Sequence, residues 1–214
     1  MQLYVVRHGI AVEGDEGIPD GSRPLTEKGR RRFQKTARAF AKLGHELDLI
    51  LTSPLVRAVQ TAEILAGATD PREVAVLEEL DPKFDAAAVR AAIATRAGKA
   101  RAVAIVGHEP QLSSVLAALS GVPQPDIDLK KGAIVRLDTS MLIDGASVHP
   151  RWWLKPKGTR VKGLPLQKQA RKSRLAGTAK KTPAMRTAKK RRPKTRKPSE
   201  PLKPSPLPVE NASP

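Results

Sequence analysis

The sequence contains no cysteine among its 214 residues. Disulfide bonds, thiolate zinc sites and cysteine-based phosphatase chemistry are therefore excluded, and the absence fits a reducing compartment. The sequence also lacks any apolar run of about eighteen residues, the length that a membrane-spanning helix needs. It does not open with a charged segment followed by an apolar one, as a secretory signal does. We therefore expect a soluble, cytoplasmic protein with no membrane partner.

Aromatic residues are scarce and unevenly placed. Phe, Trp and Tyr make up 3% of the sequence, and none follows Trp153. From Lys155 onward lie 19 of the 39 Lys and Arg residues, ten of the 19 prolines and two of the 21 acidic residues. The net charge of +18 thus divides into +17 on this segment and +1 on the residues before it. Such a segment cannot bury enough apolar surface to offset the ordering of its backbone. We predict a domain over residues 1–157 and a disordered, basic, Lys-, Ala- and Pro-rich tail over residues 158–214.

Apolar runs of strand length alternate with helical patterns along the predicted domain. Thr26 and Ser53 are placed to cap the first two helices. This alternation predicts an α/β fold of three layers, with a doubly wound, mainly parallel sheet covered by helices on both faces. We expect strands at residues 3–6, 47–51, 74–77, 102–106, 133–137 and 151–154, and helices at residues 26–43, 56–66, 85–96 and 111–119.

Three of the expected strands end at residues suited to phosphate chemistry. Arg7 and His8 follow the first strand, Arg57 lies just beyond the second, and His108 follows the strand at residues 102–106. A neutral imidazole is a competent nucleophile, and a planar guanidinium can grip two phosphate oxygens. Taken singly, each is more simply a loop histidine or a solvated arginine. Because ligands bind at the carboxyl ends of the strands in such sheets, their common position favours phosphoryl transfer.

Four segments occur in a familiar order: Val6-Arg7-His8-Gly9, Arg23-Pro24-Leu25-Thr26-Glu27-Lys28-Gly29, Thr52-Ser53-Pro54 with Arg57 and Gln60-Thr61, and Val106-Gly107-His108. Together they resemble the histidine phosphatase superfamily, which has the phosphoglycerate-mutase-like fold. The resemblance runs over residues 1–157 and is strongest to the short bacterial branch of SixA-type phosphohistidine phosphatases.

The resemblance implies a role for each matching residue. His8 would be the nucleophile and become a phosphohistidine that water later hydrolyses. Arg7, Arg57 and His108 would form the phosphate pocket, and Arg23 would add a further contact, although a solvated loop arginine is an equal alternative. Two arginines and a histidine would neutralise the phosphoryl charge, so no metal and no cofactor is implied.

The general acid is less defined. Superfamily members that act on phosphate esters use an acidic residue after the third strand, because an alkoxide leaving group needs a proton. Glu79 matches that position best and Asp81 is second, and the alternative for each is an ordinary solvated loop acid. A nitrogen-bound phosphoryl group would make a strong acid less necessary. The motif therefore leaves the leaving group open.

The length of the domain points to the substrate. The mutases of this fold carry a sizeable insertion after the third strand, whereas only a short stretch separates Asp81 from the helix expected at residues 85–96. The site should be open and suited to a phosphorylated side chain of a protein, which favours a phosphohistidine phosphatase. The alternatives are a general phosphomonoesterase of the same fold and a polyanion-binding protein anchored by the domain. The tail would bind nucleic acid or polyphosphate, or serve only as a solubilising extension.

Overall fold

The computed structural model describes residues 1–14, 17–140 and 148–166. Most of the predicted tail, from residue 167 onward, lies outside the described residues, and so does the disorder predicted for it. None of the helices in the described ranges combines the length and the apolar character that crossing a membrane requires.

Seven strands of the described chain form one sheet in the order β3-β2-β4-β1-β5-β6-β7. The first four are mutually parallel, and β5, β6 and β7 continue the sheet in antiparallel pairs. Every strand and helix predicted from the sequence is present, with ends that differ by a few residues. The strands are β1 (Gln2–Arg7), β2 (Leu49–Thr52), β3 (Glu73–Val76), β4 (Ala102–Gly107), β5 (Ile134–Thr139), β6 (Val148–Leu154) and β7 (Arg160–Lys162).

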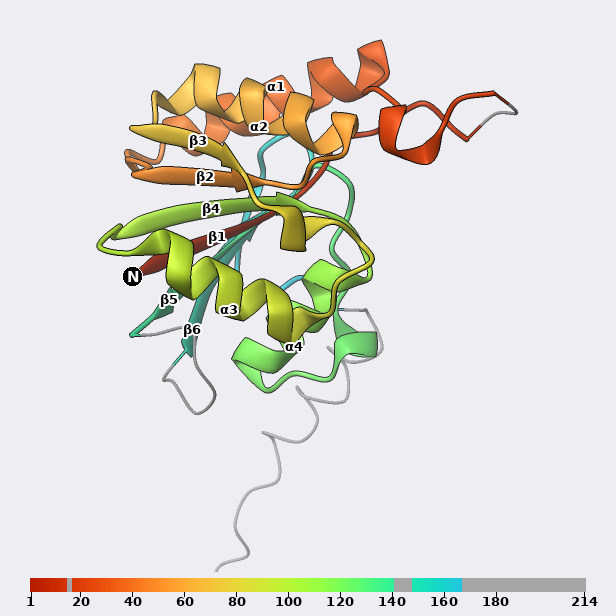
Figure 1. The fold of residues 1–214 in the computed structure, drawn as a ribbon. Helices are drawn as coiled ribbons and strands as arrows, with labels where there is room; N and C mark the ends of the chain where they lie inside the picture. Colours follow the sequence, from red (N-terminus) through yellow and green to blue (C-terminus); the bar gives the residue numbers. More distant parts are fainter. Residues whose placement is uncertain (15–16, 141–147, 167–214) are drawn as a thin grey trace, which may run out of the picture. The chain divides into compact units, whose positions relative to one another are not determined.

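Helices cover both faces of the sheet, with α1 and α2 on one side and α3 and α4 on the other (Figure 1). The helices are α1 (Glu27–Ala41), α2 (Val56–Thr69), α3 (Ala86–Ala97) and α4 (Gln111–Ser120), with single 3-10 turns at η1 (Asp20–Ser22), η2 (Glu78–Leu80) and η3 (Gln124–Asp126). The three-layer α/β fold predicted from the sequence is confirmed.

The strand residues alternate between two buried clusters, as a sheet covered on both faces requires. Along β1, Leu3 and Val5 pack with apolar side chains of α3 and α4, whereas Tyr4 and Val6 pack with those of α1 and α2. All four are fully buried. A buried side chain of this size contributes about 1.5–3 kcal/mol relative to an exposed one. This burial fixes β1 at the centre of the sheet.

The packed chain continues beyond Lys157, the boundary expected from the sequence. β7 pairs with β6 over Arg160–Lys162, and Leu164 is buried. Leu166 forms an isolated bridge with Ile127. β7 is an edge strand in which Val161 is the one apolar residue between two exposed cations, so its composition resembles that of the tail.

The parallel half of the sheet brings three loops to one edge. β1 and β2 both pair with β4, with Arg7 opposite Gly107 and Thr52 opposite Val106. The pairing extends into the loops, because the backbone N–H of His8 donates to the Gly107 carbonyl at 3.1 Å. The segments that follow β1, β2 and β4 therefore leave the sheet side by side, as the motif positions predicted.

Candidate active site

Two histidines form the centre of the candidate site. His8 and His108, which follow β1 and β4, have ring centroids 4.9 Å apart. Their exposed fractions are 6% and 2%. The Nε2 atom of His108 lies 2.8 Å from the Ser53 hydroxyl, which follows β2. All three strand ends thus contribute a side chain to one buried cluster.

The ring of His8 is held in one orientation. Its Nδ1 atom lies 2.7 Å from the carbonyl oxygen of Gly9. Because a carbonyl can only accept, Nδ1 carries the proton and Nε2 keeps its lone pair. The loop is fixed as well, since the N–H of Gly9 donates to the Thr61 hydroxyl at 3.0 Å, and that hydroxyl donates to the Arg57 carbonyl at 2.7 Å. The arrangement presents an unprotonated imidazole nitrogen.

Both histidines are neutral at physiological pH. Burial lowers the pKa of His8 to about 3, helped by the nearby His108, Arg57 and Arg7. Burial likewise lowers the pKa of His108 to about 3, with Arg57 as the next cause. A buried imidazole surrounded by fixed cations does not accept another positive charge. His8 therefore keeps its nucleophilic form without a base to deprotonate it.

Arg57 lies in the first turn of α2 and is 5% exposed. Its two terminal nitrogens donate to Asp20, one to the carbonyl oxygen at 2.6 Å and the other to carboxylate Oδ2 at 3.0 Å. Arg23 shares this aspartate through its Nε atom at 3.0 Å. The hydrogen bond from Arg23 and then that from Arg57 lower the pKa of Asp20. The two arginines are thus joined by an anionic carboxylate that the sequence analysis did not single out.

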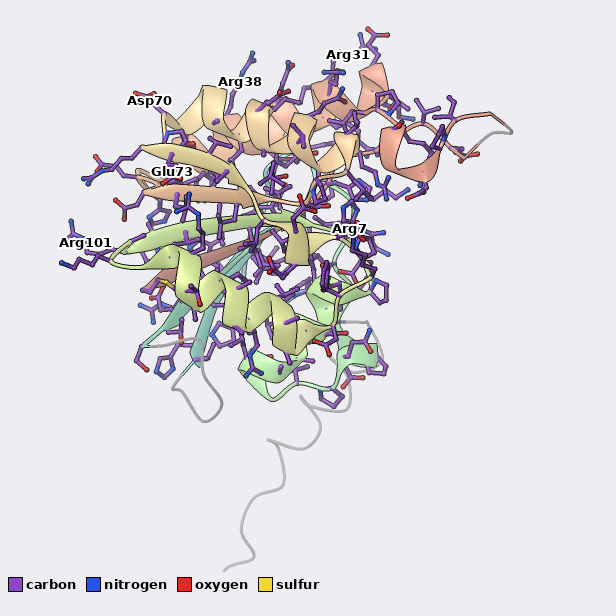
Figure 2. The ribbon with its side chains drawn as sticks, viewed as in Figure 1. Arg7, Arg31, Arg38, Asp70, Glu73 and Arg101 are labelled. Carbon is purple, nitrogen blue, oxygen red and sulfur yellow. The ribbon has the colours of Figure 1, made fainter. Side chains whose placement is uncertain are left out.

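Arg7 lies at the carboxyl end of β1, at the opposite end of the sheet from Arg101 (Figure 2). Its Nη1 atom donates to the Leu129 carbonyl at 2.7 Å, while its buried Nε atom has no hydrogen-bond partner in the described part of the chain. Burial lowers the pKa of Arg7 from its ordinary value, and the carboxylates of Glu109 and Asp128 act in the opposite direction. The guanidinium is anchored on one side and retains an unsatisfied donor.

The acid candidates lie on the loop after β3. Glu79 belongs to η2 and is half-buried, and within the described ranges its carboxylate takes part in no hydrogen bond or ion pair. Asp81 is engaged in its own turn, because its carboxylate accepts from the backbone N–H of Lys83 at 3.0 Å and lies 3.6 Å from the ammonium of Lys83. Of the two, Glu79 has the carboxylate that is free of partners.

Gln111, the first residue of α4, fixes this loop relative to His108. Its Nε2 atom lies within hydrogen-bond distance of the backbone carbonyls of Glu79, Asp81 and Phe84, at 2.8–3.0 Å. Gln111 is 5% exposed. The acid candidates are therefore attached to the same helix start that follows His108, although no hydrogen bond or ion pair joins Glu79 to His8 among the residues described.

One predicted detail is wrong, and one residue was missed. Ser53 was expected to cap α2, but that helix begins after Leu55 without a side-chain cap, and the Ser53 hydroxyl contacts His108 instead. Asp20 was missed because nothing in its local sequence indicates that it meets Arg57, 37 positions away. The nearest signal is its position three residues before Arg23.

The site contains cationic and imidazole groups and few carboxylates. Within residues 1–14, 17–140 and 148–166, no group of three His, Asp or Glu side chains is arranged to hold a metal ion. What the described side chains offer is a neutral nitrogen nucleophile beside anion-binding guanidinium groups. This is a set of groups suited to a phosphoryl group.

Comparisons with known proteins agree with this chemistry. A family model described as "Histidine phosphatase superfamily (branch 1)" matches residues 3–82. An uncharacterized protein of Picosynechococcus sp. strain PCC 7002 is 39% identical over 139 residues, covering 64% of this chain and 84% of that protein. Phosphohistidine phosphatase SixA of Escherichia coli strain K12 is 31% identical over 143 residues, covering 65% of this chain and 88% of that protein.

The fold is also similar to that of solved structures. A structure of the protein histidine phosphatase SixA complexed with tungstate matches with a TM-score of 0.60 and 25% sequence identity. The match covers 78% of this chain and 97% of that one.

Proposed function

The chain belongs to the histidine phosphatase superfamily and is a phosphatase, and we propose that it removes the phosphoryl group from phosphohistidine in a protein by way of a phosphorylated His8. The observation that carries this proposal is the hydrogen bond from Nδ1 of His8 to the Gly9 carbonyl. That bond leaves Nε2 with its lone pair, inside a cluster of phosphate-binding groups.

In the first step, Nε2 of His8 attacks phosphorus, the new P–N bond forms, and the bond to the leaving nitrogen or oxygen breaks. The leaving group takes a proton from Glu79. The half-buried Glu79 supports this role, since its carboxylate is free of described partners while that of Asp81 is held by Lys83. A phosphohistidine substrate makes a small demand on this acid, because an imidazole nitrogen leaves more easily than an alkoxide.

In the second step, water attacks phosphorus on His8, the P–N bond breaks, and inorganic phosphate leaves. Glu79 takes the proton that water gives up, so the enzyme returns to its starting state. This reversal of acid and base roles follows from the symmetry of the two displacements. His8 is again neutral, which its pKa of about 3 favours.

The spreading charge of the phosphoryl oxygens needs fixed donors around it. Arg57 and Arg7 supply guanidinium groups, and Nδ1 of His108 is buried without a hydrogen-bond partner among the residues that the structure describes. A phosphoryl oxygen on His8 would give that atom a partner. Arg57 holds the carboxylate of Asp20 in the present structure. We infer that the phosphoryl group replaces this carboxylate, one anion exchanging for another.

Two observations favour a protein substrate. The chain is 31% identical to phosphohistidine phosphatase SixA over 88% of that protein. In addition, the loop between η2 and α3 is short, with Asp85 already capping the helix, so no further element is inserted between Leu80 and Ala86. A general phosphomonoesterase is the second candidate, favoured by the availability of Glu79, since only a poor leaving group needs a strong acid.

A comparison of substrates tests the proposal. The full chain would be assayed with a protein phosphorylated on histidine by phosphoramidate, with an aryl phosphate ester and with an alkyl phosphate ester. We expect the highest kcat/KM for the phosphohistidine protein. Equal or higher values for the esters would instead assign a phosphomonoesterase. Rapid quenching should trap an acid-labile phosphoryl adduct on His8, and an adduct on another residue would overturn the mechanism.

A further inference from the structure

The exposed side of α1 carries four cations in one stripe. Lys28, Arg31, Arg32 and Lys35 are spaced at i, i+3, i+4 and i+7, so they lie along the same face of the helix. Together with Lys157 they line a depression of about 570 Å³. We call this depression the basic hollow. Figure 2 shows Arg31 projecting from α1 away from the body of the domain.

Lys157 is held in the basic hollow by a constrained turn. Its φ angle is +82°, in the left-handed region that residues other than glycine rarely adopt. The turn is packed against α1, because the N–H of Lys157 donates to the buried Thr36 hydroxyl at 3.0 Å. A Cβ atom added at Gly158 would come within 2.5 Å of the Ala39 methyl. Lys157 therefore adds a fifth cation to the stripe, although its backbone conformation is strained and the neighbouring cations repel it.

The charges of the basic hollow are nearly unneutralised. All five lining residues are basic. Arg31 pairs with Glu27 at 3.2 Å, but both side chains are more than two-thirds exposed, and such a pair contributes little. No ion pair joins the other four cations to an acid in the described ranges. A compact cluster of unpaired like charges attracts an external anion.

The basic hollow adjoins the loop that carries His8. Arg32 lines both the basic hollow and a small neighbouring cavity that Gly9 and Ile10 also line. α1 approaches this loop closely, since a Cβ atom at Gly29 would lie 2.0 Å from the Ile10 carbonyl oxygen. A partner seated on the basic hollow would therefore lie beside the loop that follows His8.

We propose that the basic hollow docks an acidic helical surface of the phosphoprotein substrate. This proposal deepens the proposed function and rests on it for the identity of the partner as substrate. Carboxylates at i, i+3, i+4 and i+7 of a partner helix would match the stripe on α1. Docking would place the phosphorylated side chain near His8 and supply substrate selectivity outside the catalytic cluster.

The composition of the basic hollow favours a protein over a nucleic acid. Its five lining residues include no aromatic side chain on which a base could stack. The residues before Lys155 carry a net charge of only +1, so the positive field around the basic hollow does not extend over the domain. A short acidic surface fits a compact cluster better than a long polyanion does.

Binding of an unphosphorylated peptide tests the docking separately from catalysis. The probe is a fluorescein-labelled helical peptide with Glu at i, i+3, i+4 and i+7, and its control has Gln at those positions. Fluorescence anisotropy would be measured with the full chain, with Lys28→Gln/Lys35→Gln, and with the matched variant Lys99→Gln/Arg101→Gln. The matched variant loses the same charge at the opposite end of the sheet, and the basic residues beyond 157 are present in all three proteins.

We expect the Kd of the Glu peptide to rise about five- to tenfold in Lys28→Gln/Lys35→Gln and to stay near the wild-type value in the matched variant. High salt should abolish the difference. Equal Kd values in the two variants would overturn the proposal. A second result would also overturn it: single-stranded DNA or polyphosphate binds the wild type more tightly than the peptide does, and this binding is weakened in Lys28→Gln/Lys35→Gln. That result would assign the basic hollow to a polyanion.

The two proposals fail in different ways. If the peptide binds the basic hollow but a phosphohistidine protein is not hydrolysed, the proposed substrate is wrong and the docking surface stands. If the phosphohistidine protein is hydrolysed but both variants bind the peptide equally, the docking proposal is wrong and the proposed function stands. Circular dichroism would check that both variants are folded.

Discussion

The structure holds positive charge in two contrasting environments. In the candidate active site, Arg57 is 5% exposed and each of its terminal nitrogens has a defined acceptor. In the basic hollow, Lys28 and Lys35 are exposed and make no ion pair within the described ranges. Burying a cation has a large desolvation cost, which is offset only when its hydrogen bonds are well formed. An exposed cation attracts anions over several ångströms, and salt weakens this attraction. The comparison suggests that the buried arginine serves the chemical step, whereas the exposed lysines serve substrate binding.

The largest effect should come from the buried nucleophile. We expect His8→Ala to abolish turnover of every substrate, because the proposed mechanism assigns the attack on phosphorus to Nε2 of His8, whereas His108 binds a phosphoryl oxygen and has its Nε2 atom beside the Ser53 hydroxyl. His45→Ala is the matched control, since His45 stacks on Trp152 and belongs to neither cationic region. Steady-state assays with both variants, together with their melting temperatures, would check this. Normal turnover by His8→Ala would show that the buried cluster is not the active site.

Arg57→Ala should lower kcat/KM by at least about a hundredfold, as the loss of a preorganised oxyanion donor does. Arg57→Lys should restore only part of it, because an ammonium cannot reproduce the planar fork. The decrease should be the same at low and high salt, unlike that of a basic-hollow variant, and Arg38→Ala provides a control with an exposed arginine. Full activity of Arg57→Lys would mean that charge alone matters, as in the basic hollow.

The buried histidines should also affect stability against pH. Each is neutral when folded down to a pKa of about 3, but takes up a proton near its ordinary pKa of 6.5 when unfolded. The unfolded state therefore binds more protons between pH 6.5 and 3, and the free energy of unfolding falls as the pH is lowered through that window. At pH 5 the loss is about 2 kcal/mol for each histidine.

Urea unfolding at pH 7 and pH 5 would measure this loss. His108→Asn should lose about 2 kcal/mol less than the wild type between the two pH values. Equal losses would show that His108 is protonated in the folded protein, which would contradict the desolvated character assigned to the candidate site. A variant of the basic hollow should show the same loss as the wild type, because it keeps both buried histidines.

The smallest effect should come from Asp20. Because its carboxylate occupies Arg57, Asp20→Asn should strengthen inhibition by inorganic phosphate, lowering its inhibition constant by a few-fold. The size is modest because Asp20 is two-thirds exposed and its attraction is screened by water. A higher inhibition constant would indicate instead that Asp20 positions the guanidinium. Initial rates at several phosphate concentrations would distinguish the two.

The fold and most of the site follow from local sequence patterns. His8 and His108 could be predicted because each follows a strand directly, and Arg57 because it lies in the first turn of the helix after β2. Parallel pairing brings these strand ends together whatever the loops contain. Glu79 could be placed at the same edge for the same reason. Whether it contacts the substrate depends on loop geometry, which sequence spacing does not determine.

What could not be predicted depends on contacts between distant segments. Asp20 meets Arg57 through a loop with no helical or strand pattern. The edge strand β7 is paired through its backbone to β6, and its two cations conceal it within the composition of the tail. Lys157 joins the stripe on α1 only because of an unusual backbone conformation. Each of these features depends on a contact between segments that are distant in the sequence, so no local sequence pattern predicts it.

The contacts of Gln111 have a consequence for how such an enzyme can evolve. Its side chain reaches the loop after β3 through three backbone carbonyls and through no side chain of that loop. Every amino acid supplies the same carbonyl, so substitutions at positions 79, 81 and 84 leave the attachment unchanged. The loop can exchange its chemical groups while its path is preserved. Single substitutions in this loop can therefore adapt the enzyme to new leaving groups without displacing the nucleophile.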